Sequence, residues 1–394
     1  MTCRLCSEDS VELHFDFGEQ PIVHHLIDSE DQPYKKHPFK VGYCHVCGLL
    51  QLIDHIKPED LYQNYFTVSA WKAQPHAPRL IQLMESVFGI EHQTRILEIG
   101  CNDGTFMELL ANHKYKNAIG FEPTQDAFEL ALGRGLNVVN DFFDPNTATS
   151  LMGGENPDLI VSRQVIEHIP DLHAFLDGVS EVLNPGGGLV LEMPDHSMNY
   201  ETLDYTFWEE HVNYFTLNTM RSLLALHGFE IVHHESTLFS GKAFFVFARK
   251  SNSDTPRSIS VNPDHEQAIR YRDLYPELRN GMIKMLEGVS DRGVALYGGG
   301  ARSCNFINLL GLGDYIDYII DDQPEKQNKI VPGANLTMRS YSRELDKDKF
   351  FLLGVNCEVE AKVVRKRALS QFASVLPPSV NLPRFWQELA QIKI

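Results

Sequence analysis

Short apolar runs alternate with amphipathic stretches through the middle of this chain. The first run contains Ile96, Leu97 and Ile99, and further runs follow at 115–121, 136–140, 158–162 and 189–192. Apolar residues recur with helical spacing at 76–88, 105–113, 171–183 and 217–227. Strands that alternate with helices indicate an α/β fold with a parallel sheet covered on both faces. Ligands of such sheets bind at the carboxyl ends of the strands.

The first apolar run leads into a glycine-rich turn. Residues 95–104 read R-I-L-E-I-G-C-N-D-G, so Gly100 and Gly104 bracket a turn between a strand and a helix. Side chains at these positions would keep a ligand away from the turn and the helix N-terminus. With Glu98 and Asn102, the pattern E-x-G-x-x-x-G is not the dinucleotide fingerprint G-x-G-x-x-G. A plain tight turn is the alternative interpretation.

Acidic and aromatic side chains follow the next two runs at positions suited to a nucleoside. Glu122 comes about 20 residues after the turn, where a carboxylate can accept hydrogen bonds from both ribose hydroxyls. Asp141 and Phe142 offer an acceptor for an adenine amino group and a ring to lie against the base. This order of pieces resembles the class I S-adenosylmethionine-dependent methyltransferases over about residues 90–250. The resemblance implies a Rossmann-like core with S-adenosylmethionine as cofactor, and Gln164 at its methionine end.

Composition narrows the class of partner. The 394 residues predict two to three domains. The formal net charge of −18, with 53 acidic against 35 basic residues, disfavours nucleic acid as a partner. Apolar stretches fall short of the roughly 20 residues of a membrane span, and the N-terminus lacks the apolar region of a signal peptide. We therefore expect a cytosolic enzyme for a small molecule, a monomer or weak homo-oligomer, without membrane partners.

Two cysteine pairs near the N-terminus indicate a metal site. Cys3 and Cys6, then Cys44 and Cys47, each follow a C-x-x-C spacing and can offer four thiolates to one Zn²⁺. A set of four ligands leaves no open position, so the expected zinc is structural. Disulfides or redox thiols are the alternative. His45 is a competing ligand, but both cysteines of its pair are present.

An aromatic segment separates these cysteines from the core. Residues 57–77 contain Tyr62, Tyr65, Phe66 and Trp71 among polar neighbours. The segment is either a lid over the substrate or packing between two domains, and we weigh these equally. The helix expected at 76–88 begins the core, which gives domain boundaries of 1–74, 75–250 and 251–394.

A histidine segment after the fifth strand carries candidate chemistry. Residues 207–215 read F-W-E-E-H-V-N-Y-F, and insertions at this point of the fold overhang the cofactor's methyl group. A histidine beside carboxylates, such as His211, is expected to keep a pKa near neutral or above and to accept a proton at physiological pH. A surface histidine with acidic neighbours by chance is the alternative.

The whole chain resembles the sugar C-methyltransferases that act on nucleotide-linked 4-keto-deoxysugars. The resemblance rests on the four-cysteine module, the methyltransferase core, the E-H-x-x-Y-F segment and a glycine-rich C-terminal domain. In that family a Tyr-His-Glu-His run supplies the active site, and its last histidine is the proposed base. The resemblance implies that His211 is the base and Glu210 its orienting or substrate-binding partner. Trp208 and Glu209 replace the tyrosine and the first histidine of the family, which leaves the substrate open.

The same resemblance implies further substrate contacts. The family's second histidine falls at His168, which we expect as a pocket wall more readily than as a base. Tyr65 matches a family tyrosine of the aromatic lid, with Tyr62 close by, and Tyr214 belongs to the histidine segment. O- or N-methylation of another small metabolite, and an inactive binding protein with this fold, are the alternatives to C-methylation.

The C-terminal third repeats the strand–glycine–helix pattern. A polar, proline-bearing linker at 251–264 precedes an expected helix at 265–288 and strands at 293–297 and 315–320. Gly298, Gly299 and Gly300 follow the first strand, and Asp321 follows the second, as in a nicotinamide site. The family resemblance implies instead a second Rossmann-like domain that serves as a substrate platform, with Arg302 adding charge for a diphosphate. A structural repeat that binds nothing is the alternative.

Overall fold

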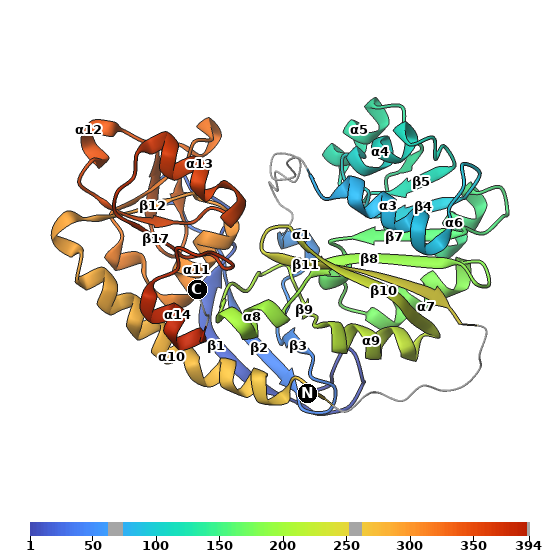
Figure 1. Cartoon of the computed structure of the whole chain (residues 1–394), viewed down its shortest axis with the longest axis horizontal. Helices are drawn as coiled ribbons and strands as arrows, with labels where there is room; N and C mark the ends of the chain where they lie inside the picture. The colour runs from blue at the N-terminus through green and yellow to red at the C-terminus, as the bar shows by residue number, and fades with distance from the viewer. Residues whose placement is uncertain (62–73, 252–261, 392–394) are drawn as a thin grey trace.

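The chain folds into two α/β bodies joined by a smaller sheet. The computed structural model describes residues 1–61, 74–251 and 262–391. In Figure 1 the methyltransferase-like core lies on the right, the C-terminal domain lies on the left, and the N-terminal sheet lies between them. This arrangement confirms the expected fold class of a Rossmann-like core, a cysteine module and a second α/β domain.

The core contains a seven-stranded sheet in the order β10-β11-β8-β7-β4-β5-β6. Its strands are β4 (Ile96–Ile99), β5 (Ala118–Phe121), β6 (Val138–Val139), β7 (Leu159–Arg163), β8 (Gly188–Pro194), β10 (Phe229–Leu238) and β11 (Lys242–Lys250). The five strands from β6 to β8 are parallel, and β11 runs antiparallel to both of its neighbours. Every residue of β4 and β7 is buried, as expected for parallel strands covered on both faces.

Helices cover this sheet. They are α3 (Ala77–Phe88), α4 (Thr105–Asn112), α5 (Gln125–Gly133), α6 (Pro145–Leu151), η1 (Ile166–His168), α7 (Leu172–Val182) and α9 (Leu217–Leu226). The short helix α8 (Ser197–Thr202) packs instead against helices of the C-terminal domain. The strands and helices expected from periodicity are present with small shifts at their ends. At 136–140 only two residues pair, as β6. This strand lies at the edge of the sheet and pairs with β5 alone.

The N-terminal module is a four-stranded antiparallel sheet in the order β1-β2-β3-β9. The module itself supplies β1 (Val11–Pro21), β2 (Lys36–Cys44), β3 (Leu50–Leu52) and the short helix α1 (Pro58–Leu61). The fourth strand, β9 (Asn213–Tyr214), comes from the histidine segment of the core. The core therefore contributes part of its histidine segment to the sheet of another module.

The C-terminal domain has a six-stranded sheet in the order β14-β15-β13-β12-β16-β17. Its strands are β12 (Val294–Tyr297), β13 (Tyr318–Ile320), β14 (Ile330–Val331), β15 (Leu336–Arg339), β16 (Phe350–Leu353) and β17 (Phe372–Ser374). Its helices are α10 (His265–Glu287), η2 (Ser290–Arg292), α11 (Ala301–Leu310), η3 (Gly313–Tyr315), η4 (Pro324–Lys326), α12 (Arg343–Asp346), α13 (Cys357–Arg367) and α14 (Arg384–Ala390).

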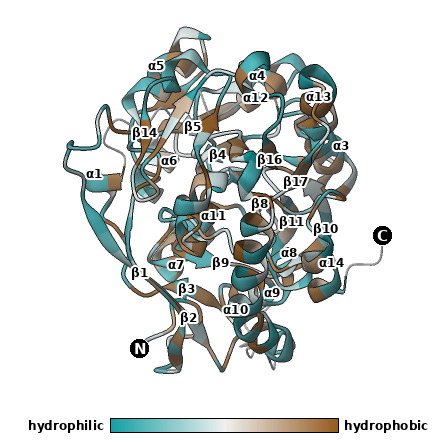
Figure 2. Cartoon of the chain, turned by 90° about the vertical axis from the view of Figure 1, so that its left-hand side faces the viewer, coloured by the Kyte–Doolittle hydropathy of each residue, from teal (hydrophilic) through white to brown (hydrophobic). Residues whose placement is uncertain are grey.

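The long helix α10 links the C-terminal domain to the rest of the molecule. Figure 2 shows both hydrophobic and hydrophilic residues along it. Tyr271, Leu278 and Met282 recur at helical spacing and are fully buried. They join a hydrophobic cluster that also includes Phe15 of β1 and Tyr205 of the core. This cluster thus has members from all three parts of the chain. No helix among residues 1–61, 74–251 and 262–391 is long and apolar enough to cross a membrane.

A buried ion pair gives Arg302 a different position from the expected one. The guanidinium of Arg302 is 6% exposed and pairs with Asp204 of the core, and it donates a second hydrogen bond to the Pro377 carbonyl at 2.5 Å. Asp204 is itself 2% exposed. The expected diphosphate contact is therefore corrected, because this side chain joins the C-terminal domain to the core.

Replacing Arg302 tests this buried connection. The Arg302→Ala variant leaves the Asp204 carboxylate buried without its partner, so we expect a loss of about 3–5 kcal/mol in the free energy of unfolding. Urea denaturation measures the change. Arg384→Ala is the matched control, because it removes an exposed arginine from an ion pair within one helix, and its unfolding curve should stay close to the parent curve. An Arg302→Ala curve that overlays the parent would contradict the role assigned to the pair.

Candidate active site and zinc cluster

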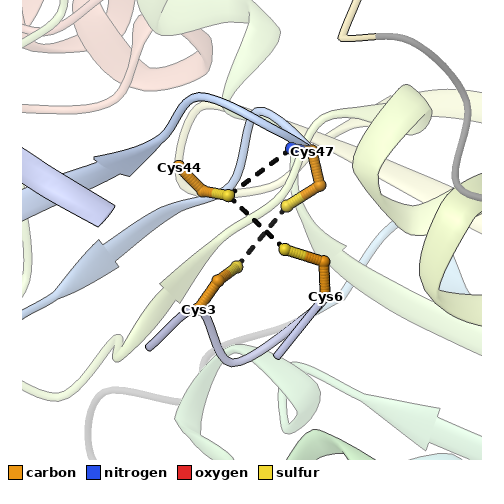
Figure 3. Close-up of side chains that lie close together, drawn as sticks. All are labelled: Cys3, Cys6, Cys44 and Cys47. Carbon is orange, nitrogen blue, oxygen red and sulfur yellow. Dashed lines mark hydrogen bonds between the residues drawn. The ribbon is translucent and has the colours of Figure 1, made fainter. Parts of the chain in front are cut away.

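The four expected metal ligands lie together. Cys3 and Cys6 come from the first turn of the chain, Cys44 ends β2, and Cys47 follows in the next turn. Figure 3 shows the four thiols pointing toward one another. The Cys3 and Cys47 sulfurs are 3.5 Å apart, as are those of Cys6 and Cys44, and all four lie within 4.8 Å of one another. Zinc–sulfur bonds of about 2.3 Å in a tetrahedron place sulfurs at this kind of separation, so the cluster fits a structural Zn²⁺.

The backbone around the cluster also suits thiolate ligands. The amides of Leu5 and Cys47 point at the sulfurs of Cys3 and Cys44, each at 3.4 Å. Gly48 closes the second knuckle in the left-handed conformation, with φ of +84°. His45, the competing ligand, is 3.0 Å from a Glu12 carboxylate oxygen and is not part of the cluster. The cysteine set is therefore complete without it.

The zinc knuckle is tied directly to the histidine segment. Nη1 of Arg4, between the first two cysteines, donates to the carbonyls of Leu52 at 2.7 Å and Val212 at 3.2 Å. The Leu52 amide donates to the same Val212 carbonyl at 3.0 Å. Val212 is the residue after the candidate base His211. The folding of the zinc module thus determines where the histidine segment runs.

The glycine-rich turn lies at the carboxyl end of β4. Gly100 and Gly104 adopt φ of +74° and +76°, a conformation that side-chain-bearing residues rarely take. A Cβ at Gly100 would lie 2.5 Å from a Val165 methyl, and one at Gly104 would lie 2.3 Å from Leu136. Backbone conformation and packing against neighbouring loops therefore require both glycines. This differs from the expectation that they serve only to admit a ligand.

Glu98 presents an uncompensated carboxyl group beside this turn. It is 2% exposed, and its Oε2 has no hydrogen-bond partner among the described residues. Burial, together with the charges of Glu192 and Glu122 nearby, raises its pKa to about 8, although Arg163 opposes the shift. A narrow pocket is lined by Gln74, Glu98, Gly100, Cys101, Asp103, Thr105, Phe106 and Arg163. A cationic ligand group in this pocket would compensate the buried acid.

The candidate ribose and adenine contacts lie beyond the neighbouring strands. Glu122 follows β5 and is buried, and it accepts from the Asn102 amide at 2.8 Å and the Thr124 amide at 2.9 Å. Burial raises the pKa of Glu122. Phe142 is 65% exposed, and an Asp141 oxygen accepts from the Phe142 amide at 2.8 Å. A large exposed ring at this edge suits stacking against a flat ligand.

A buried polar network behind the turn was not expected from the sequence. The Arg163 side chain donates to Glu192 at 2.7 Å and to Gln74 at 2.6 Å, and the His76 Nε2 lies 3.0 Å from the other Glu192 oxygen. Burial alone would raise the pKa of Glu192, but Arg163 and His76 hold it at about 2. The sequence signal that could have indicated this network was a charged residue at the end of each of two apolar runs. These residues, Arg163 and Glu192, are register partners on β7 and β8. Gln164 joins the network at 3.2 Å from Glu192.

The histidine segment brings several expected residues together. The Trp208 ring stacks on the His211 imidazole, with centroids 5.4 Å apart and planes 19° apart. His168 meets the same imidazole edge-on, with centroids at 4.8 Å. Its Nδ1 lies 2.9 Å from the Glu210 carbonyl oxygen, so the contact with Glu210 is through the backbone. His168 and His211 are partly exposed, and Glu210 is buried.

The environment of His211 differs from the expected one. Burial lowers its pKa well below the ordinary value, and the neighbouring His168 adds to this effect. The expectation that adjacent carboxylates hold the pKa near neutral or above is therefore wrong. The Glu209 carboxylate is engaged by other groups. It accepts hydrogen bonds from the Val23 amide at 3.0 Å and from the Asn305 side chain at 2.8 Å.

Two further substrate contacts were expected, from Tyr214 and Tyr65. Tyr214 has protein partners, and Tyr65 lies outside the described residues. The Tyr214 hydroxyl donates to the Trp208 carbonyl at 2.9 Å and accepts from the Trp208 amide at 3.1 Å, so it closes the turn that holds His211. This corrects the expectation that Tyr214 contacts the substrate directly. Tyr65 and the other lid aromatics at positions 62, 66 and 71 lie outside the described residues.

The second glycine turn, at the start of α11, is bridged by protein groups. Asp321 accepts from the Gly299 amide at 3.0 Å, and the Lys326 ammonium donates to the Gly299 carbonyl at 3.1 Å. Asp322 pairs with Lys366 at 3.0 Å and with Arg367 at 2.6 Å. Both acids that would accept ribose hydroxyls in a nicotinamide site are thus held by donors of the domain itself.

Comparison with known proteins decides the class. Residues 71–234 match the family model "Methyltransferase domain", residues 3–62 match "Putative zinc binding domain", and residues 264–371 match "C-methyltransferase C-terminal domain". The chain is an S-adenosylmethionine-dependent methyltransferase. Its four-cysteine module binds zinc.

Relatives align with this methyltransferase over different extents. The C-methyltransferase NovU of Streptomyces niveus is 27% identical over 359 residues, which are 86% of this chain and 85% of that protein. The ubiquinone biosynthesis O-methyltransferase of Chelativorans sp. is 33% identical over 95 residues, 24% of this chain and 37% of that protein. The solved magnesium protoporphyrin IX methyltransferase of Synechocystis PCC 6803 is 12% identical and aligns over 49% of this chain and all of its own, with a TM-score of 0.39.

The buried carboxyl of Glu98 predicts a proton release when the methyltransferase binds its cofactor. With a pKa of about 8, Glu98 is mostly protonated at pH 7, whereas a cationic group beside it favours the ionised form. Calorimetry of S-adenosylmethionine binding in buffers of different ionisation enthalpy measures this release. We expect the Glu98→Gln variant to lose the release and to bind about ten- to a hundredfold more weakly. Glu129→Gln, an exposed change on α5, is the control, and a parent protein that releases no proton would contradict the assignment.

Zinc removal should loosen the histidine segment. The methyltransferase should carry about one zinc per chain, and Cys47→Ser should lose it. Because Arg4 and β3 hold Val212 in place, hydrogen exchange over residues 208–215 should then become faster. Metal analysis and exchange mass spectrometry test both points. Cys357→Ser is the control, since that cysteine lies on α13, outside the cluster. Full zinc content in Cys47→Ser would refute the ligand set.

Proposed function

We propose that this methyltransferase transfers a methyl group to a carbon adjacent to a ketone. The acceptor we infer is a nucleotide-linked deoxysugar, and His211 is the general base. Two findings support C-methylation over other transfers. The alignment with the C-methyltransferase NovU extends over all three parts of the chain, and the C-terminal domain matches a domain described from C-methyltransferases.

The environment of His211 is the observation that carries the proposal. Its imidazole is partly exposed, lies between Trp208 and His168, and is neutral at physiological pH because its pKa is lowered. A neutral imidazole with a free nitrogen can take a proton from a carbon, and the ketone makes that proton acidic by delocalising the resulting charge. The low pKa reduces the driving force for proton transfer. A donor at the developing oxyanion therefore has to supply part of the stabilisation.

Trp208 can supply such a donor. It occupies the place of the family tyrosine, whose phenol could polarise the substrate carbonyl. The indole N–H is also a hydrogen-bond donor, although it cannot accept a proton or release one as a phenol can. Trp208 stacks on the His211 ring, so a donor on its edge lies in the same part of the site. We infer that this change retains oxyanion stabilisation and alters the shape of the acceptor pocket.

The remaining residues position the reaction. Val212 and Tyr214 hold the His211 turn against β3 and Trp208, and the Glu210 carbonyl fixes the His168 ring as a pocket wall. Glu98, Glu122, Asp141 and Phe142, with the turn at Gly100 to Gly104 and Gln164, are the groups that we infer hold S-adenosylmethionine. When bound there, the cofactor supplies an electrophilic methyl group for the carbanion. Holding the partners in one orientation provides a large share of the acceleration.

The alternative of O- or N-methylation loses part of its basis. It rested on the replacement of family residues by Trp208 and Glu209. Glu209 is 2% exposed and bridges Val23, just after β1, to Asn305 on α11. The presence of a glutamate at this position therefore has a structural reason. Hydrogen bonds to Glu209 lower its pKa despite its burial. Only the replacement at Trp208 touches the proposed base.

His211→Ala tests the base. We expect the variant to bind S-adenosylmethionine as the parent does and to lose turnover of a nucleotide-linked 4-keto-deoxysugar by about 10²- to 10⁴-fold. Mass spectrometry follows methyl incorporation, and deuterium exchange from D₂O at the acceptor carbon follows proton removal. His113→Ala is the control, because His113 is an exposed residue at the C-terminal end of α4. Turnover in His211→Ala at the parent rate refutes the base, and a methylated product without carbon exchange in any acceptor favours O- or N-methylation.

The pH profile provides a second test. The base must be neutral to act, and its lowered pKa keeps it neutral below the ordinary histidine value of about 6.5. The acidic limb of kcat/KM should therefore have an apparent pKa below about 6.5. A limb centred at or above that value would show that protonation of another group controls the reaction.

A further inference from the structure

We propose that Glu167, His168 and His211 form a second metal site, which binds one divalent transition-metal ion and is distinct from the four-cysteine zinc cluster. One ligand atom of each residue lies within 4.8 Å of the other two. Two imidazoles and a carboxylate are a common ligand set for such ions, and three protein ligands leave a position open for water. Small side-chain rotations bring atoms at this separation into the first coordination sphere.

The hydrogen bond of His168 prepares it as a ligand. Its Nδ1 lies 2.9 Å from the Glu210 carbonyl oxygen, which can only accept. The proton of a neutral His168 therefore sits on Nδ1, and Nε2 carries the lone pair that a metal requires. A backbone carbonyl in this role is typical of histidines that bind metals, because it fixes the tautomer and the ring orientation.

Glu167 has a carboxyl group that lacks compensation. It is 1% exposed, and neither of its oxygens has a hydrogen-bond partner within the described part of the chain. A buried acid in this state is costly unless it is paired or binds a metal. The Val212 amide donates to the Glu167 carbonyl at 2.8 Å, which holds the backbone of Glu167 beside the histidine segment. His168 and His211 are partly exposed, so an ion has access from solvent.

Occupancy of this site has a consequence that rests on the proposed function. The ion would take the lone pair of His211 that otherwise accepts the substrate proton. Binding of the metal and proton removal by His211 therefore exclude each other, and the ion-bound enzyme is inactive. No bond to substrate or cofactor is involved. The two neutral imidazoles bind the ion through their lone pairs, and a proton leaves to solvent only where the Glu167 carboxyl carried one beforehand.

Cobalt binding tests the site without relying on turnover. Enzyme with its cysteine zinc in place is titrated with Co²⁺, and the visible absorption of the bound ion is recorded. We expect one additional ion per chain, with no sulfur-to-cobalt charge-transfer band, in the parent and in His113→Ala. The near-isosteric Glu167→Gln and the partly exposed His168→Ala should each weaken this binding at least tenfold while keeping the circular dichroism and zinc content of the parent. Absence of an additional ion in the parent, or parent-like affinity in both folded variants, would overturn the proposal.

An inhibition assay separates this proposal from the assignment of the base. We expect excess Zn²⁺ to reduce parent turnover at least tenfold, and a chelator too weak to remove the cysteine zinc to restore it. Cobalt binding by the ligand set with turnover unchanged at full occupancy would overturn the exclusion and the base assignment together, and the metal site would stand. Absence of cobalt binding in the parent, together with loss of turnover in His211→Ala, would overturn the metal site and leave the base assignment in place.

Discussion

The pairing of β9 with β3 is the interaction on which the site depends. Asn213 and Tyr214 align with Gln51 and Leu50, and the Leu52 amide continues the contact at the Val212 carbonyl. A two-residue strand has little stability by itself, so its position is set by the strand it joins. That strand lies a few residues after the zinc knuckle, whose Arg4 donates to Val212 as well. Zinc bound by the four cysteines would therefore help to hold in place the segment that carries His211.

The buried acids of the molecule include two groups, those that join parts of the fold and those that face candidate ligand positions. Where an acid joins parts of the fold, it is compensated. Glu192 has Arg163, Asp204 has Arg302, and Glu209 has two donors from separate parts of the chain. Such pairs orient structure more than they add stability, because desolvation offsets much of the attraction.

Within the described part of the chain, neither Glu98 nor Glu167 has an ion pair or a side-chain hydrogen bond, and both face candidate ligand positions. Glu98 lies beside the glycine turn and Glu167 beside the histidine pair, and burial raises the pKa of each. Local rules of polar satisfaction are broken at functional sites more often than elsewhere. The contrast with the paired acids indicates that a cation at each position supplies what the protein leaves out. S-adenosylmethionine, with its sulfonium and ammonium groups, would satisfy this condition at Glu98 if it binds where we propose.

Local patterns in the sequence were sufficient for the parallel strands of the core and for the helices that alternate with them, because a fully buried parallel strand such as β4 reads as a continuous apolar run. The cysteine cluster was equally accessible, since ligand spacing in a knuckle is local. Contacts between distant segments were not accessible. The Tyr214 hydroxyl is spent on the Trp208 backbone, and Arg302 pairs across two domains, and neither fact has a local signature. The lowered pKa of His211 belongs to the same class, because packing of Trp208 and His168 decides it.

The two departures from the family run at positions 208 and 209 thus have different meanings. Glu209 points away from the imidazole, toward Val23 and Asn305, and its carboxylate completes a buried junction of three parts. A histidine there would need other partners, so the junction and the residue must change together. Trp208 points toward the base and forms one face of its pocket. On the proposed mechanism, a difference in acceptor between this enzyme and its relatives would therefore be concentrated at the indole, which stacks on the His211 imidazole.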